Sequence, residues 1–303
     1  MIGFDSIRSE LLTSFRNQKL HHAIILHGKK GVGKASFAKE FALEILNQTS
    51  TNHPDLLLIE KDPEKREINV DKIRGIFDFS NRTSSNSPHK FIIIDSACEL
   101  NKSSSNALLK ILEEPHSNNF LILISHNLNR ILPTIRSRCH IIKTTNLSAV
   151  NFHEILQKQN LHFSEKDLRF ISEICDNSPS EAINLGLDLT RFYELFLRSI
   201  YNKKLNEELL KILSDKKISF DIFEKSYEFF LNRLLKNSSG NLFNFFFDEE
   251  KVFFNLCQKF STQKILELSD STLPTLHKTN SLNLDKKLIL ITIFNKICYE
   301  QTL

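Results

Sequence analysis

The sequence predicts an α/β phosphate-loop domain with a parallel five-stranded sheet, followed by a small helical domain and an all-α C-terminal domain. Three observations support this fold class. In the first half of the chain, apolar runs alternate with segments of helical periodicity, which is typical of a parallel sheet covered by helices on both faces. A glycine-rich loop, Gly28 to Lys34, lies between the first apolar run and the following helix. After about residue 147 only helical patterns remain.

Each element of the first half follows from its hydrophobic pattern. Ile7, Leu11 and Phe15 have the spacing of one helix face and precede the first predicted strand. Pro115 cannot continue a helix, so we expect the last helix of this half to end there. The predicted strands cover residues 22–26, 56–59, 91–95, 120–125 and 140–143. The predicted helices that alternate with them cover residues 34–46, 70–79 and 103–114.

The second half predicts two helical domains. A break is expected at 237–241, where small and polar residues gather. The final helix, 284–299, is apolar on almost all sides, which predicts a buried element of a bundle. The helices expected before these cover residues 151–159, 165–175 and 180–189. The predicted domains are 1–147, a phosphate-loop domain; 148–190, a helical lid; and 191–303, a helical C-terminal domain.

A stripe of large apolar residues recurs at helical spacing in the C-terminal domain. Such a stripe can bind a partner or form an ordinary core face, and we favour the core face. Its members are Phe220, Phe223, Tyr227, Phe230, Leu231 and Leu234.

The composition is that of an ordinary globular protein. Hydrophobic residues make up 41% and charged residues 25% of the 303 residues, and the net charge of +4 permits nucleic-acid contact without arguing for it. The five cysteines are far apart, so neither a zinc site nor a disulfide framework is predicted. The N-terminus lacks the pattern of a signal peptide, and no apolar run approaches the roughly 20 residues of a membrane span. We expect a cytoplasmic protein without membrane contact.

The loop from Gly28 to Lys34 fits the pattern G-x-x-x-x-G-K between a strand and a helix, which is the context that a phosphate-binding loop requires. Glycines let the backbone N–H groups turn toward phosphate oxygens, and the helix N-terminus adds a favourable dipole. Lys34 would reach the terminal phosphates. The alternative is a glycine-rich turn that arose by chance. The predicted nucleotide-binding residues are Gly28, Gly31, Gly33, Lys34, Asp95 and Ser125.

Other positions of this site depart from the pattern of an active ATPase. Ala35 occupies the place of the Ser or Thr hydroxyl that ligates magnesium, and Ser36 lies about 100° further around the helix. Asp95 ends the third strand where a metal-associated carboxylate is expected, but Ser96 follows it instead of a water-activating Glu. Asp95 can also be a solvated loop residue. These departures predict that the chain does not turn over ATP efficiently.

Two further residues carry a functional and a structural interpretation. Ser125 ends the fourth strand, where a polar residue can sense the terminal phosphate, and the neighbouring His126 is more often structural. Arg138 follows the segment 132–137, Leu-Pro-Thr-Ile-Arg-Ser. A finger arginine neutralises charge on a phosphoryl group bound by a neighbouring subunit. A surface salt bridge is the alternative for Arg138, and the upstream motifs favour the finger.

Four stretches of the chain resemble the delta-prime subunit family of bacterial DNA polymerase III clamp loaders, which are AAA+ proteins. The resemblance is strong over about residues 1–148 and continues beyond them only in helical character and length. The stretches are 19–23, 68–74, 106–115 (Asn-Ala-Leu-Leu-Lys-Ile-Leu-Glu-Glu-Pro) and 131–139 (Ile-Leu-Pro-Thr-Ile-Arg-Ser-Arg-Cys).

The resemblance implies a stator in a multi-subunit loader. Arg138 would complete the ATP site of an adjacent gamma or tau subunit, and the assembly with delta would open the beta sliding clamp and place it on primed DNA. Residues 106–115 would form a structural helix near a subunit interface, and 191–303 would form the oligomerisation collar. The chain would belong to a nucleotidyltransferase complex without holding a polymerase site.

Three departures from the family refine this expectation. Residues 49–54 contain no cysteine, whereas many relatives carry a four-cysteine zinc module there, so zinc is not expected. Glu181 stands where active loaders have a sensing Arg, and Ala35 and Ser96 are the losses already described. The losses at Ala35, Ser96 and Glu181 favour a delta-prime subunit over the gamma/tau ATPase. They are compatible with weak binding of ATP or ADP. The alternatives are an active gamma/tau-like ATPase and a repair-associated AAA+ protein that binds nucleic acid.

Overall fold

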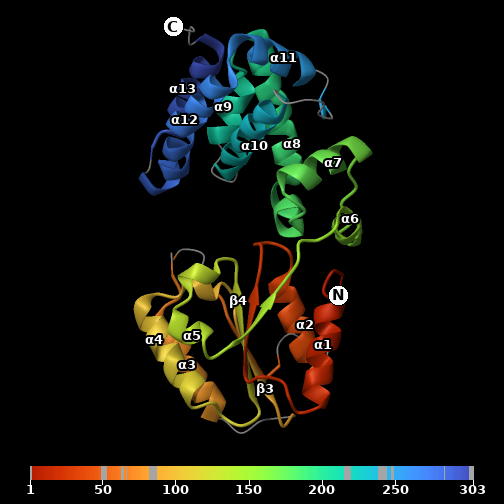
Figure 1. Ribbon diagram of the computed structural model, residues 1–303, viewed down its shortest axis with the longest axis vertical. Coiled ribbons are helices and arrows are strands. Elements are labelled where there is room, and N and C mark those ends of the chain that lie inside the picture. The colour runs from red at the N-terminus through yellow and green to blue at the C-terminus, as the bar shows by residue number, and fades with distance from the viewer. Residues whose placement is uncertain are drawn as a thin grey trace. The chain divides into compact units, whose positions relative to one another are not determined.

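A computed structural model of the chain divides into two compact units (Figure 1). The first consists of Met1–Ile155 with Ser178–Ser180, and the second of Leu156–Asn177 with Glu181–Leu303. The structure describes residues 2–48, 53–62, 65, 67–81, 87–214, 220–237, 244–246, 249–282 and 284–299.

A single parallel sheet forms the centre of the first unit, in the strand order β2-β3-β4-β1-β5. This confirms the predicted five-stranded parallel sheet. In register, His27 at the end of β1 lies opposite Ser125 at the end of β4, so the carboxyl ends of these neighbouring strands lie at the same end of the sheet. The strands are β1 (Ala23–His27), β2 (Leu56–Ile59), β3 (Lys90–Ile94), β4 (Asn119–Ser125) and β5 (His140–Lys143).

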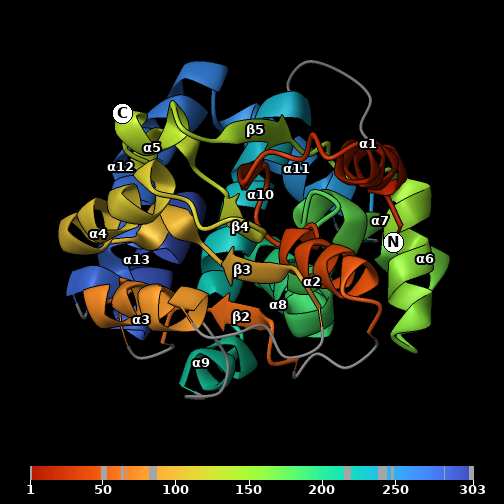
Figure 2. The same cartoon turned by 90° about the horizontal axis from the view of Figure 1, so that it is seen from below.

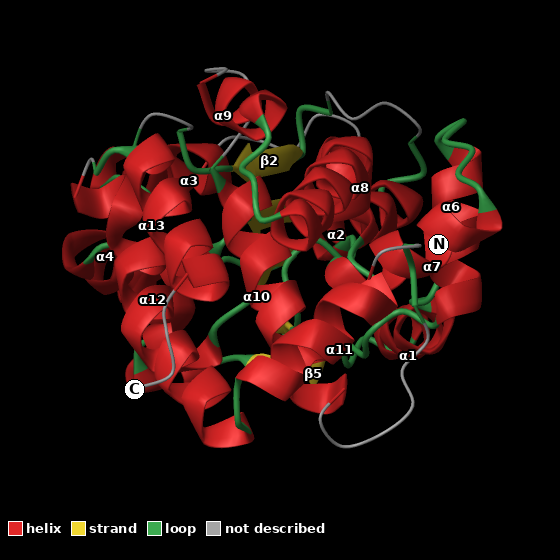
Figure 3. Cartoon of the chain, turned by 90° about the horizontal axis from the view of Figure 1, so that it is seen from above, coloured by secondary structure: helices red, strands yellow, loops and turns green. Residues whose placement is uncertain are grey.

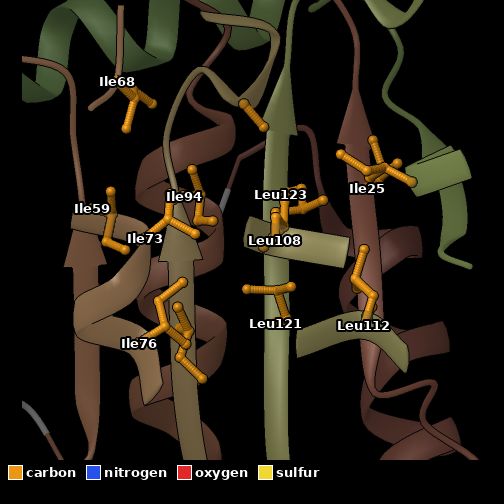
Figure 4. Packing of buried hydrophobic residues seen from close by; sticks show 14 of the residues in the cluster. Ile25, Ile59, Ile68, Ile73, Ile76, Ile94, Leu108, Leu112, Leu121 and Leu123 are labelled. Atoms are coloured by element: carbon orange, nitrogen blue, oxygen red, sulfur yellow. The ribbon is translucent and has the colours of Figure 1, made fainter. Parts of the chain in front are cut away.

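Helices cover both faces of the sheet, with α1 and α2 on one face and α3 and α4 on the other (Figure 2). Strand residues alternate between two buried clusters: Ile24 packs on the side of α1 and α2, and Ile25 on the side of α3 and α4. Figure 4 shows Ile25, Ile94 and Leu123 in the second of these clusters. The helices are α1 (Asp5–Arg16), α2 (Lys34–Ile45), α3 (Val70–Asn81), α4 (Lys102–Glu113) and α5 (Pro133–Arg136), with 3-10 turns at Ala97–Glu99 and Leu128–Arg130.

The described residues after Lys143 form helices and connecting segments, with no strand among them (Figure 3). Within the described residues, no helix is long and apolar enough to cross a membrane. The helices are α6 (Ala149–Lys158), α7 (Glu165–Ile174), α8 (Pro179–Asn202), α9 (Glu207–Ser214), α10 (Asp221–Asn237), α11 (Glu249–Lys259), α12 (Thr262–Leu282) and α13 (Lys286–Tyr299).

Two predictions for this helical half are wrong. The helix expected at 180–189 continues to Asn202, because no glycine or proline interrupts its apolar face after Leu189. The expected domain boundary between 190 and 191 therefore falls inside α8, and the separation of a lid at 148–190 from a domain at 191–303 stays a prediction. The final helix is not buried on all sides, since Leu288 is 60% exposed while Leu290 is fully buried.

Two other predictions of this half have different outcomes. The stripe of large apolar residues from Phe220, just before α10, to Leu234 is buried at every one of its six positions, which confirms the core interpretation. The break predicted at 237–241 begins where α10 ends, and its residues 238–241 lie outside the described residues.

A buried ion pair, which no sequence motif predicted, lies in the second unit. Arg233 and Glu249 are 3% and 0% exposed, and Arg233 Nε lies 2.7 Å from Glu249 Oε1. The Tyr193 hydroxyl donates to Glu249 Oε1 at 3.0 Å, and the Phe245 N–H donates to Glu249 Oε2 at 2.6 Å. Both carboxylate oxygens of Glu249 are thus satisfied, which buried charges require.

Candidate functional site

The predicted phosphate loop joins β1 to α2, and its glycines answer different steric demands. Gly31 and Gly33 have φ values of 80° and 96°, in the left-handed region that favours glycine. At Gly28, an added Cβ would lie 2.0 Å from the Thr144 hydroxyl, which follows β5. Gly33 also precedes the first turn of α2 as its N-cap. The loop conformation therefore depends on all three predicted glycines.

Lys34 extends back along the loop from the start of α2. Its ammonium donates to the Gly28 carbonyl at 2.8 Å and also to the Lys29 carbonyl, and the side chain is buried. Burial lowers the pKa of Lys34 from its usual 10.5 to about 8, although the nearby Asp95 charge acts in the opposite direction. The positive charge of Lys34 is therefore held inside the loop and costs desolvation energy at neutral pH.

This burial predicts how Lys34 affects stability as the pH changes. Between pH 8 and 10.5 the unfolded chain binds the Lys34 proton and the folded chain does not, so the stability contribution of Lys34 rises with pH across this window. Urea unfolding of the full chain should show the free-energy difference between wild type and Lys34→Met growing in favour of wild type from about pH 8 upward. Lys39→Met serves as the control, because Lys39 lies in a surface ion pair with Glu60. Parallel pH curves for wild type and Lys34→Met would contradict the shifted pKa.

Asp95 follows β3 and its N–H donates to the Ile59 carbonyl of β2 at 2.9 Å. Because β3 and β1 are both parallel to β4 and pair with it, this position lies at the same carboxyl end of the sheet as the loop after β1. Ser96 has φ 60°, a left-handed conformation, and its hydroxyl donates to Asp95 Oδ1 at 3.5 Å. Asp95 thus lies within electrostatic reach of Lys34, but the side chain that follows it is a short hydroxyl.

Ser125 is connected directly to the phosphate loop. Its carbonyl accepts a hydrogen bond from the Gly28 N–H at 3.1 Å, and its buried hydroxyl accepts from the Asn127 N–H at 3.1 Å. These bonds give Ser125 a structural task in the loop. Its predicted role as a phosphate sensor stays a prediction.

His126 lies beside Cys98, with Cys98 Sγ 3.3 Å from His126 Nδ1. Burial lowers the pKa of His126; the Glu99 charge acts in the opposite direction, and the positive charges of Lys30, Lys34 and Arg130 act in the same direction as burial. This environment favours the neutral imidazole. No sequence pattern predicted this contact, because Cys98 follows β3 and His126 follows β4.

The segment Ser178–Ser180 belongs to the first unit and lies against the phosphate loop. The Ser180 N–H donates to the Gly31 carbonyl at 3.2 Å, and a Cβ at Gly31 would lie 2.1 Å from the Ser178 hydroxyl. Glu181, at the predicted sensing position, begins the part of α8 in the second unit and forms an ion pair with Lys225 at 2.5 Å. The sequence analysis singled out Glu181, but it predicted neither the contact of Ser178–Ser180 with the loop nor the ion pair of Glu181 with Lys225.

Arg138 follows α5, as expected for the finger position. Its Nη1 donates to the Thr134 carbonyl at 3.1 Å, and its Nη2 lies 2.9 Å from Glu113 Oε1 at the end of α4. The Arg138 and Glu113 side chains are 39% and 51% exposed. The structure thus brings the nucleotide-binding candidates together at the loop. It places Arg138 in a separate, solvent-accessible ion pair.

One group of residues in the described part of the chain has the spacing of metal ligands. Glu224 and Glu228 on α10 and His277 on α12 have ligand atoms within 4.8 Å of one another. All three belong to the second unit. The resemblance places the zinc module of many relatives at 49–54. Of these positions, 49–52 lie outside the described residues.

Comparisons with known proteins agree with the sequence resemblance. The family described as "DNA polymerase III, delta subunit" matches residues 5–148. The DNA polymerase III subunit delta′ of Pseudomonas aeruginosa is 27% identical over 209 residues, which cover 63% of this chain and 59% of that protein. The subunit gamma of Buchnera aphidicola subsp. Schizaphis graminum is 34% identical over 204 residues, which cover 61% of this chain and 56% of that protein. This chain thus spans less than two thirds of the length of either relative.

A solved structure supports the fold across almost the whole chain. A DNA polymerase III gamma subunit-related protein from Thermotoga maritima has a TM-score of 0.57, covers 97% of this chain and 98% of its own, and is 18% identical. At this identity the likeness concerns the fold alone, an α/β domain with a parallel sheet followed by helices. The phosphate loop, Asp95 and Arg138 all lie within residues 5–148, the part of the chain that matches the delta-subunit family, and together with the delta′ relatives this match supports assignment to the clamp-loader delta′ family.

Proposed function

We propose that this chain is the stator subunit of a DNA polymerase III clamp loader, which supplies an arginine to a neighbour and does not hydrolyse ATP itself. The observation that carries this proposal is a contrast between two sites. The chain's own phosphate loop has Ala35 and Ser96 at the magnesium and water-activating positions, while the Arg138 guanidinium is accessible on the surface. A site that cannot place magnesium or water is suited to assembly rather than turnover.

In the proposed mechanism, Arg138 enters the ATP site of an adjacent gamma or tau subunit. Its guanidinium neutralises the charge that develops on the transferring phosphoryl group, and its planar fork suits phosphate oxygens. The neighbouring subunit supplies magnesium and the attacking water. Delta, the beta sliding clamp and primed DNA are the further proposed partners, with 191–303 as the collar through which the subunits join.

The chain's own loop has a weaker proposed role, the binding of ATP or ADP without turnover. Gly28, Gly31, Gly33 and Lys34 would hold the phosphates, with Asp95 and Ser125 at the edge of the site. Two features oppose tight binding: the Lys34 ammonium is hydrogen-bonded to loop carbonyls, and Ser178–Ser180 lie against Gly31. A nucleotide would have to displace both sets of contacts.

A gamma/tau-like ATPase is the second candidate, because the similar relatives include gamma subunits and one of them is 34% identical. The two candidates differ in the activity of the isolated chain. We expect the purified chain to turn over ATP far more slowly than about 1 per second, the lower end of ordinary enzyme turnover. Turnover at or above that rate would reject the stator and favour the ATPase.

The assay should use the full chain with and without its candidate partners. We expect the chain to co-elute with gamma or tau and with delta. We also expect the chain alone to show very slow ATP hydrolysis. An active chain that does not join those subunits would leave the repair-associated alternative. DNA binding that falls steeply with salt would then support that alternative.

A further inference from the structure

The ends of two separate sequence motifs meet at Arg138. Glu113 is the last residue of α4, within the segment 106–115 that has no chemical role in the proposed function. Arg138 follows α5, twenty-five positions later by its number, and the two charges lie 2.9 Å apart. The contact therefore depends on how α4 and α5 pack.

The packing beneath this ion pair is fixed by a common core. Leu108 and Leu112 of α4 and Ile135 of α5 are buried in the same cluster, on one face of the sheet. Figure 4 shows Leu108 and Leu112 in that cluster. The backbone positions of Glu113 and Arg138 are thus set by buried neighbours, while their charged ends remain exposed.

Electrostatics favour a cation at this point. Glu113 ends α4, where the helix dipole is negative and destabilises a carboxylate. The Arg138 guanidinium offsets both the helix dipole and the Glu113 charge. Thr134, whose carbonyl accepts from Nη1, provides a second anchor one turn before Arg138.

These two anchors hold the guanidinium without using all of its donors. One contact uses Nη1 and the other uses Nη2, and a guanidinium has further N–H groups on these nitrogens and on Nε. An orientation fixed by two contacts reduces the rotamer freedom that a long side chain must lose when it enters a site.

We propose that Glu113 is a positioning residue for Arg138: it orients the guanidinium so that its remaining donors face a phosphate of the neighbouring subunit. This inference rests on the proposed finger function of Arg138. The opposite role, in which Glu113 withholds the arginine, is disfavoured because both side chains are about half exposed. An ion pair in such a setting is too weak to keep a guanidinium from a polyanion such as a nucleoside triphosphate.

The test uses the reconstituted loader and its DNA- and clamp-stimulated ATP hydrolysis. Glu113→Ala should lower kcat by about two- to fivefold at the site that Arg138 serves, the range that an exposed ion pair can contribute, and leave KM for ATP unchanged. Glu113→Gln keeps an oxygen acceptor and should lose less. Glu114→Gln is the matched control, because Glu114 is the exposed neighbouring carboxylate just after α4 and should have no effect.

A double variant separates positioning from an independent effect. Arg138→Ala/Glu113→Ala should be no slower than Arg138→Ala alone, because Glu113 acts only through Arg138. An additional loss in the double variant, or a wild-type or raised kcat in Glu113→Ala, would overturn the inference. Co-elution of every variant with the other subunits checks that assembly is intact.

The same series distinguishes this inference from the function on which it rests. If Arg138→Ala slows the loader but Glu113→Ala does not, the finger stands and only the positioning role is rejected. If Arg138→Ala leaves turnover unchanged, the finger is rejected and the positioning role falls with it.

Discussion

Arg138→Ala should lower the stimulated ATP hydrolysis of the reconstituted loader while leaving the subunit folded and assembled. The residue is half exposed and its contacts are one surface ion pair and one backbone carbonyl, so its removal should cost the fold little. Its proposed target belongs to a neighbour, so the defect should appear only in the complex. In other phosphoryl-transfer systems a finger in trans contributes about 10³-fold or more to turnover.

The measured loss should nevertheless be partial, because a loader has several ATP sites and this arginine would serve one. Arg138→Lys should not restore full activity, since a point charge cannot reproduce the bidentate geometry of a guanidinium. Arg136→Ala is the matched control, two positions earlier at the end of α5. Unchanged hydrolysis and clamp loading by fully assembled Arg138→Ala would leave Arg138 with only a structural role, through its contacts with Glu113 and Thr134.

Arg233→Ala should destabilise the second unit by about 3–5 kcal/mol, the cost of leaving a buried charge without its partner. Glu249 is fully buried, and among the described residues it would keep the Tyr193 hydroxyl and the Phe245 N–H as donors. The Arg233 guanidinium also lies 4.4 Å from the centre of the Phe245 ring, and this packing is lost as well. Urea unfolding followed by circular dichroism should report the change.

Arg191→Ala is the control for this variant. Arg191 also pairs with a glutamate, Glu208, but both side chains are substantially exposed. Its loss should cost less than about 1 kcal/mol, as for other surface ion pairs. A similar midpoint for the two variants would mean that the buried pair contributes no more than the exposed one.

The strand–helix alternation of the first unit was predictable because burial on both faces of a parallel sheet demands uninterrupted apolar strands. The strands predicted at 56–59 and 140–143 agree with β2 and β5, and the boundaries of the other three differ by one residue at most at either end. The phosphate loop was predictable for a related reason, since its glycines adopt conformations that other residues disfavour. Local chemistry thus determined the elements and the positions of most site candidates.

The boundary of α8 shows where this reasoning fails. The sequence predicted an end near Leu189, at the edge of an expected domain, but no local signal ends the helix there. A helix continues as long as its apolar face finds neighbours, and Phe192, Tyr193 and Phe196 are all fully buried in the second unit. Packing therefore set the length of α8.

The amino-acid sequence by itself determined the fold class, the family resemblance and the residues that depart from the pattern of an ATPase, because each depends on local pattern or residue type. Only the tertiary structure decided the pairings: Ser125 with Gly28, Glu113 with Arg138 and Arg233 with Glu249. Each pair joins residues on different elements, and side-chain charges carry no information about which distant partner the packing will bring near. Buried apolar contacts position the elements, and the polar partners follow from that arrangement.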